Sequence, residues 1–95
     1  MDEARLKRLR MRSWRRGTKE MDLILGPYSD TQLTAMTPVE LDLYERLLDE
    51  NDQDLYLWVA ARLRDEHPGP QDLTGLLDRV ADHAQARLIA KSRQF

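Results

Sequence analysis

The amino-acid sequence predicts an all-α fold, a small bundle of five helices joined by short connections. In successive segments the apolar residues recur at helical spacing, which is typical of amphipathic helices. The alternation that marks a strand never lasts beyond a few residues, and β-branched residues are scarce. Glycine, proline and polar clusters separate the segments at short intervals, so consecutive helices should pack as antiparallel neighbours. At 95 residues, the chain has the length of one domain, residues 1–95.

The first predicted helix covers residues 2 to about 16 and is strongly basic. Residues 1–19 carry eight basic and two acidic side chains, net +6, whereas the remaining residues carry seven basic and fifteen acidic ones, net -8. Trp14 falls on the apolar side of this helix, where we expect it to pack in the core. A basic helix on an acidic body suits a complementary protein surface, an anionic cofactor or a nucleic acid, and it can also pair with its own domain.

The second helix is predicted to run from Thr18 to Leu25, because the pair Gly26-Pro27 then interrupts it. Residues 28–36 are expected to form a turn or a second helical piece. The bundle as a whole should extend from about residue 18 to about residue 91.

Clear start and stop signals delimit the next three helices. Thr37-Pro38-Val39-Glu40 combines an N-cap threonine, a proline in the first turn and a glutamate three residues after the cap. A polar break at 50–54 precedes the fourth helix, and His67-Pro68-Gly69-Pro70 ends it. The fifth and longest helix begins at residue 71 or 72, and residues 92–95 should fray. The apolar stripes comprise Leu41, Tyr44, Leu47 and Leu48, then Leu55, Trp58, Val59 and Leu63, then Leu73, Leu76, Leu77, Val80, Ala81, Ala84 and Leu88.

The residue inventory argues against a self-contained enzyme. The chain lacks cysteine, so it has no thiolate metal site and no cysteine nucleophile. His67 and His83 are interpreted as ordinary surface side chains, and the serines lie outside any known nucleophile motif. We therefore expect no catalytic residue, no metal ligand and no tightly bound cofactor. No apolar run approaches the length needed to span a bilayer, and membrane insertion is not expected.

The hexapeptide Arg15-Arg16-Gly17-Thr18-Lys19-Glu20 joins the first two helices and permits two interpretations. In the first interpretation, the hexapeptide is only the boundary between two helices: the arginines complement the end of one helix, Gly17 adopts a left-handed backbone and Thr18 caps the next helix. As a recognition site, the exposed arginine and glutamate side chains contact a partner. Binding of nucleic acid through the basic helix is a less favoured alternative, because residues 40–66 carry nine acids against three bases.

Arg16-Gly17-x-x-Glu20, with Arg15 before it and Met21-Asp22 after it, resembles the R-G-x-x-E signature of the SdhE family of FAD assembly factors. A second stretch, Leu47-Leu48-Asp49-x-x-Asp52-x-Asp54-Leu55-x-x-Trp58, resembles the family's other recognisable segment at the expected separation. The resemblance spans about residues 5 to 90. It implies a five-helix bundle and a protein that assists assembly of another enzyme.

The resemblance also implies a partner and a set of contact residues. Members of this family bind the flavoprotein subunit of succinate dehydrogenase or fumarate reductase and promote covalent attachment of FAD to its histidine. Carried over to this sequence, the partner-binding residues are Arg16, Gly17 and Glu20, followed by Arg15, Asp22 and Trp58. Because only fifteen residues precede Arg16-Gly17, we expect a cytoplasmic protein of bacterial type without a presequence. The alternative function is a small basic-helix module that binds nucleic acid or proteins in general.

Overall fold

The computed structural model describes residues 3–92 of the chain, with the side chains described as far as Arg87. It confirms the all-α prediction, since the described residues form helices and no strand. Short 3-10 turns accompany the α-helices. The elements in order are α1 (Glu3–Trp14), α2 (Lys19–Gln32), η1 (Leu33–Ala35), α3 (Pro38–Leu48), α4 (Asp52–Ala61), η2 (Arg62–Arg64), η3 (Gln71–Leu73) and α5 (Thr74–Ser92).

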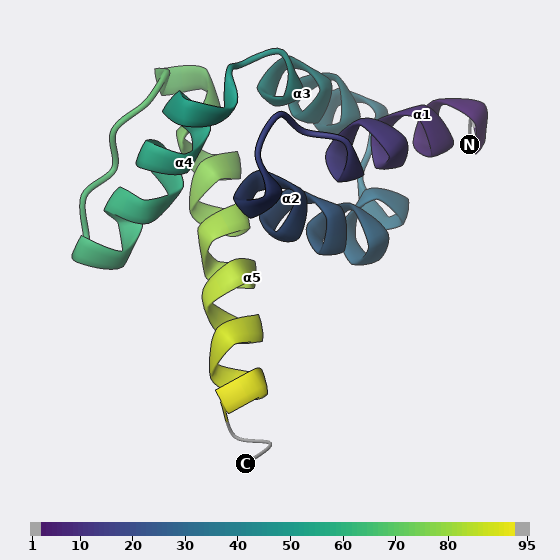
Figure 1. Cartoon of the computed structure of the whole chain (residues 1–95). Coiled ribbons are helices and arrows are strands. Elements are labelled where there is room, and N and C mark those ends of the chain that lie inside the picture. The colour runs from purple at the N-terminus through teal and green to yellow at the C-terminus, as the bar shows by residue number, and fades with distance from the viewer. Residues whose placement is uncertain (1–2, 93–95) are drawn as a thin grey trace.

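Helix α2 is the central element of the bundle, because it packs against α1 on one side and against α5 and α4 on the other. Figure 1 shows α5 running between α4 and α2, while α3 lies beside α1. The core where these helices meet consists of leucines with a few larger side chains. Its most fully buried members are Leu9, Met21, Leu25, Leu33, Tyr44, Leu47, Leu55, Leu73, Leu76, Leu77 and Val80.

The predicted start signals are confirmed. Thr18 adopts an extended backbone and its hydroxyl accepts a hydrogen bond from the backbone N–H of Met21 at 3.3 Å. Thr37 and Glu40 form a complete capping box, in which each side chain accepts from the other's backbone N–H. Asn51 caps α4 by accepting from the backbone N–H of Asp54 at 2.8 Å.

The predicted interruption of the second helix is wrong, because α2 continues through Gly26 and Pro27 to Gln32. Proline has no N–H to donate to the carbonyl four residues earlier, which is that of Leu23. A guanidinium N–H of Arg87, from α5, donates to this carbonyl at 3.1 Å. A side chain from another helix thus replaces the missing hydrogen bond.

Trp14 corrects a second expectation, since its side chain is 40% exposed and lies outside the core. Its indole ring rests directly on Gly26, where any Cβ atom would overlap it. The indole N–H donates to Asp30 at 3.1 Å. The ring therefore covers α2 from the surface and leaves one edge in solvent.

Several helix ends, and the burial of one side chain, differ from the prediction. Helix α1 ends at Trp14 instead of residue 16, and a 3-10 turn precedes α5. Leu63 is 58% exposed because it falls in η2, where the helical period of α4 no longer applies. Ser92 closes α5 although fraying was expected from it onward; residues 93–95 and the side chain of Leu88 lie outside the described residues. None of the described helices has the length and apolar character that crossing a bilayer requires.

Candidate functional site

The candidate site is built around the turn that joins α1 to α2, residues 15–18, and it lies against the start of α4. Helix α1 ends at Trp14 and α2 begins at Lys19. The backbone N–H of Arg15 still donates to the Arg12 carbonyl of α1, but those of residues 16–18 bond to side chains and to no helix carbonyl. Such groups need other acceptors when they are partly buried. Two carboxylates supply them.

Arg16 fixes the turn to the connection between α3 and α4. Its side chain is only 10% exposed, and Nε donates to Asp52 at 2.7 Å. The two terminal nitrogens donate to the backbone carbonyls of Leu48 and Glu50, at 2.7 Å and 2.8 Å. These carbonyls lie at and just beyond the C-terminal end of α3, where a helix favours positive charge. The guanidinium therefore satisfies three acceptors from a segment more than thirty residues away.

Asp52 and Asp22 bind three consecutive backbone N–H groups of the turn. The second carboxylate oxygen of Asp52 accepts from the N–H groups of Gly17 and Thr18, the latter at 3.1 Å. Asp22 accepts from the N–H of Arg16 at 2.5 Å. Charge-assisted bonds of this kind are stronger than those between neutral groups. The turn is thus held by ionic hydrogen bonds on both sides.

Gly17 is required for space. The left-handed backbone predicted for it is wrong, since Gly69 is the glycine with a positive φ among the described residues. A Cβ atom at position 17 would lie 2.9 Å from the Asp52 carboxylate oxygen that the backbone binds. Glycine therefore allows the carboxylate to reach the backbone.

The six predicted contact residues divide into two groups. Arg15, Gly17 and Glu20 are exposed. Arg16 and Asp22 face the protein itself, and Trp58 is partly buried against the core. Their role in binding a partner stays a prediction, but the structure shows which of them a partner can reach directly.

Two hollows flank the turn, and they meet at the ion pair between Arg16 and Asp52. The first, of about 360 Å³, is bounded by the basic face of α1 and is lined by Arg8, Met11, Arg12, Arg15 and Arg16. The second, of about 460 Å³, lies between the start of α2 and α4 and is lined by Thr18, Glu20, Asp52, Gln53, Tyr56 and Leu57.

Sequence reasoning missed Tyr56 and Leu57, although their side chains are 45% and 63% exposed beside Glu20. The available signal was the position of two large apolar residues off the buried stripe of α4. Exposed apolar side chains at a hollow are typical of binding surfaces.

The described residues contain no group of three or more histidine or acidic side chains placed to hold a metal ion. His67 instead hydrogen-bonds Asp78 at 2.9 Å, which raises the pKa of its imidazole and lowers the pKa of the Asp78 carboxyl. His83 packs edge-on against Tyr28, and burial lowers its pKa. Both histidines thus have structural partners.

Residues 7–84 match the family model described as flavinator of succinate dehydrogenase, Sdh5. The chain belongs to the Sdh5 family. The match covers most of α1, all of α2 to α4 and the first part of α5, including both stretches that carried the resemblance. In this Sdh5-family fold, Arg16 of the first stretch and Asp52 of the second are joined by their ion pair.

Two of the curated relatives that the chain matches come from yeasts. The chain is 33% identical to the mitochondrial succinate dehydrogenase assembly factor 2 of Meyerozyma guilliermondii over 97% of its own length and 62% of the relative's. It is 43% identical to the protein of the same name from Scheffersomyces stipitis over 92% of its own length and 53% of the relative's. The Sdh5-family chain thus spans roughly three fifths or less of the curated relatives it matches.

The expected cytoplasmic location is wrong in the light of these relatives, which are named mitochondrial proteins. That expectation depended on the number of residues before Arg16-Gly17. This number says nothing about the compartment in which a folded bundle of this kind works.

Proposed function

We propose that this chain is an assembly factor that binds the flavoprotein subunit of succinate dehydrogenase and promotes covalent attachment of FAD to a histidine of that subunit. The observation that carries the proposal is the family match over residues 7–84. The named function of the fungal relatives, assembly of succinate dehydrogenase, supports it. The proposal extends to the related flavoprotein of fumarate reductase as a second client.

The contribution of this chain is binding and positioning. Flavin attachment requires a carbon of the isoalloxazine ring to be held against an imidazole nitrogen, and fixing such a geometry removes much of the barrier to a reaction. A rigid surface can hold a mobile segment of the flavoprotein in the reactive arrangement. The turn at residues 15–18 suits this role because its backbone is fixed by Asp22 and Asp52.

Within the site, the exposed residues make the direct contacts. Gly17 lets a partner's backbone approach closely, and Arg15 and Glu20 offer a cation and an anion on either side of it. Arg16 and Asp22 act indirectly, since their polar groups are already used to hold the turn. The chain needs no catalytic residue, metal or tightly bound cofactor of its own, because FAD is bound and modified in the flavoprotein.

The test is a reconstitution with purified flavoprotein subunit, FAD and this chain, scored by flavin fluorescence of the denatured subunit in a gel. Wild type should increase the covalent flavin, and Glu20→Ala should abolish most of the increase while remaining folded. A first-turn glutamate stabilises a helix by only about 0.3 to 1 kcal/mol. Glu3→Ala is the matched control, because Glu3 is an exposed glutamate in the first turn of α1.

Two results would count against this function. If wild type neither binds the flavoprotein nor raises its covalent flavin, the assembly role is wrong. If Glu20→Ala supports flavin attachment as well as Glu3→Ala does, the turn serves only to join two helices.

A further inference from the structure

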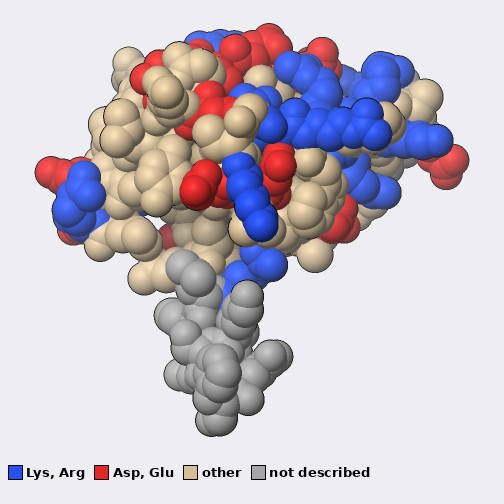
Figure 2. Space-filling view, viewed as in Figure 1, with Lys and Arg blue, Asp and Glu red and all other residues tan. Residues whose placement is uncertain are grey.

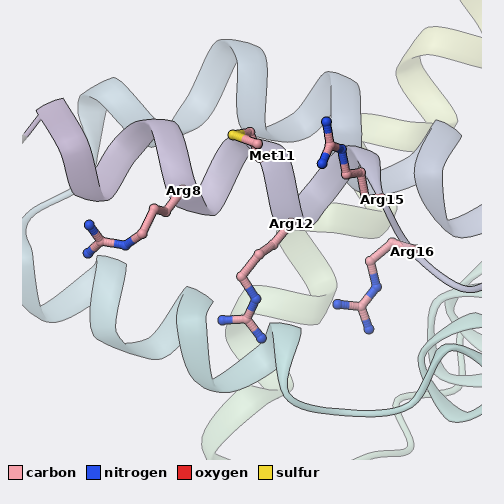
Figure 3. A pocket seen from close by; sticks show the side chains of 5 residues that line it. All are labelled: Arg8, Met11, Arg12, Arg15 and Arg16. Carbon is pink, nitrogen blue, oxygen red and sulfur yellow. The ribbon is translucent and has the colours of Figure 1, made fainter.

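The basic hollow beside the turn is a second surface of unusual charge. It is lined by Arg8, Met11 and Arg12 of α1 and by Arg15 and Arg16 just after that helix. Figure 3 shows these side chains leaving the helix along its length, with Met11 between Arg8 and Arg15. In Figure 2, Lys and Arg side chains gather on the part of this face where Figure 1 places α1.

The four arginines of this hollow differ in how their charges are used. Arg16 is neutralised by Asp52, and Arg12 pairs with Asp49 at 2.9 Å. Arg8 and Arg15 are exposed, and their guanidinium groups have no acceptor within the part of the chain that the structure describes. Met11, 42% exposed, adds an apolar surface between them. Two guanidinium groups and a thioether are thus left for something outside the chain.

We propose that this basic hollow binds an acidic segment of the flavoprotein partner, with Arg8 and Arg15 each pairing with a carboxylate and Met11 contacting the apolar part of the segment. This inference rests on the proposed function and adds a second contact surface to the turn. Because the hollow ends at Arg16, the two surfaces are continuous. A guanidinium group can bind a carboxylate through two parallel hydrogen bonds, so the pairing gives orientation as well as attraction.

The surroundings of the hollow favour an acidic protein segment over a nucleic acid. Helix α3 places Asp42 and Glu45 along the same side, and Asp49 follows its last residue there. These carboxylates pair with Arg5 and Arg12. A duplex carries a phosphate charge about every 1.7 Å along its axis, so neighbouring phosphates would face these carboxylates. A segment with a few acidic residues can place its charges on Arg8 and Arg15 alone.

The experiment compares two double variants that lose the same charge. Arg8→Gln/Arg15→Gln removes the two available cations of the hollow. Lys7→Gln/Arg64→Gln is the control, because Lys7 lies on α1 outside the hollow and Arg64 is an exposed residue of η2. Binding of each to the purified flavoprotein subunit is titrated at about 50 mM and about 300 mM salt, where charges are screened to different extents.

We expect the arginine variant to bind roughly tenfold more weakly than wild type at low salt and to show a flatter salt dependence. Complementary charges at an interface raise the affinity, and they also make it depend on salt. The control should stay close to wild type. Hydrogen exchange of the flavoprotein should show an acidic segment that wild type protects and the arginine variant does not.

Three outcomes would overturn the inference. If the arginine variant binds like the control while Glu20→Ala fails, the turn contacts the flavoprotein and the hollow does not. If duplex DNA or RNA binds wild type tightly through Arg8 and Arg15 and the flavoprotein does not need them, the hollow belongs to nucleic acid. If wild type does not bind the flavoprotein at all, both this inference and the proposed function fail.

Discussion

Arg16 and Asp52 show what a single residue pair contributes to this protein and what the sequence alone conveys about it. The motif around Arg16 and the stretch containing Asp52 were both recognisable, but as separate signals 36 residues apart. Helical periodicity assigns a residue to a face of its own helix and does not identify a partner on another helix. The sequence therefore conveyed neither the 10% exposure of Arg16 nor its three internal acceptors.

Asp52→Ala should destabilise the fold by about 3 kcal/mol, because it leaves Arg16 and two backbone N–H groups without their carboxylate. Urea unfolding measures the loss. Asp49→Ala is the control, since this carboxylate is 64% exposed and pairs with Arg12 at the surface, where such a pair contributes about 0 to 1 kcal/mol. Equal losses for the two variants would show that the Asp52 contacts add nothing beyond an ordinary surface pair.

The buried pair of Ser13 and Tyr44 gives a second prediction at this scale. Their hydroxyls share a hydrogen bond of 2.6 Å, and the Ser13 hydroxyl also donates to the Leu9 carbonyl at 2.8 Å. Tyr44→Phe should cost about 1 kcal/mol, because Ser13 keeps its second partner. Ser13→Ala should cost more, up to about 3 kcal/mol, because the Tyr44 hydroxyl is left buried and unpaired. Thermal or urea unfolding gives the order, and the reverse order would contradict this assignment.

At the scale of the element, the helix starts were predictable and the continuation of α2 was not. A capping box such as Thr37 to Glu40 satisfies its own backbone groups, so local sequence is sufficient to identify it. The Gly26-Pro27 pair has the local features of a helix stop. It does not stop α2, because Trp14 fills the space that the glycine leaves and Arg87 donates to the carbonyl that the proline cannot reach. Both compensations come from other helices.

Gly26→Ala should destabilise the protein although alanine is the better helix former. A Cβ atom at this position overlaps the ring of Trp14, and overpacking of this kind costs about 1 to 3 kcal/mol, which exceeds the helical gain of about 1 kcal/mol. Gly75→Ala in α5 is the matched control, because nothing lies within 4 Å of a Cβ atom there. It should stabilise the fold by up to about 1 kcal/mol. Unfolding midpoints that rise for both variants would show that Trp14 moves aside without cost.

For the whole molecule, the five-helix bundle and its uneven charge were both predictable from the sequence. Periodicity identified the segments, and the count of charges identified a basic start on an acidic body. The sequence left open whether the basic helix pairs with its own acidic domain or with a molecule outside it. In the structure, α1 uses part of its charge internally, through Arg5, Arg10 and Arg12. Arg8 of α1 and Arg15 just after it stay at the surface. This division depends on which carboxylates α2, α3 and the residue after α3 place opposite α1, and the sequence of α1 alone does not contain it.

The stability of the whole bundle should respond to pH through two histidines that act in opposite directions on α5. The pKa of His67 is raised because it hydrogen-bonds Asp78 and Asp65. Its contribution is therefore complete below the ordinary histidine pKa of 6.5 and is lost as pH rises through the raised value. The pKa of His83 is lowered by burial and by Arg87. Its neutral ring therefore stabilises the fold above pH 6.5, and this stability is lost as pH falls toward the lowered value.

Urea unfolding at about pH 7.5 and about pH 5.5 separates the two histidines, because this interval contains the ordinary histidine pKa and lies above those of most carboxylates. His67→Gln should lose more stability than wild type on acidification, since the compensating gain from His67 is absent. His83→Gln should lose less, since its ring no longer has to be protonated against Tyr28 and Arg87. If all three proteins lose the same stability between the two pH values, the contacts of His67 with Asp78 and of His83 with Thr31 do not depend on the protonation of these rings.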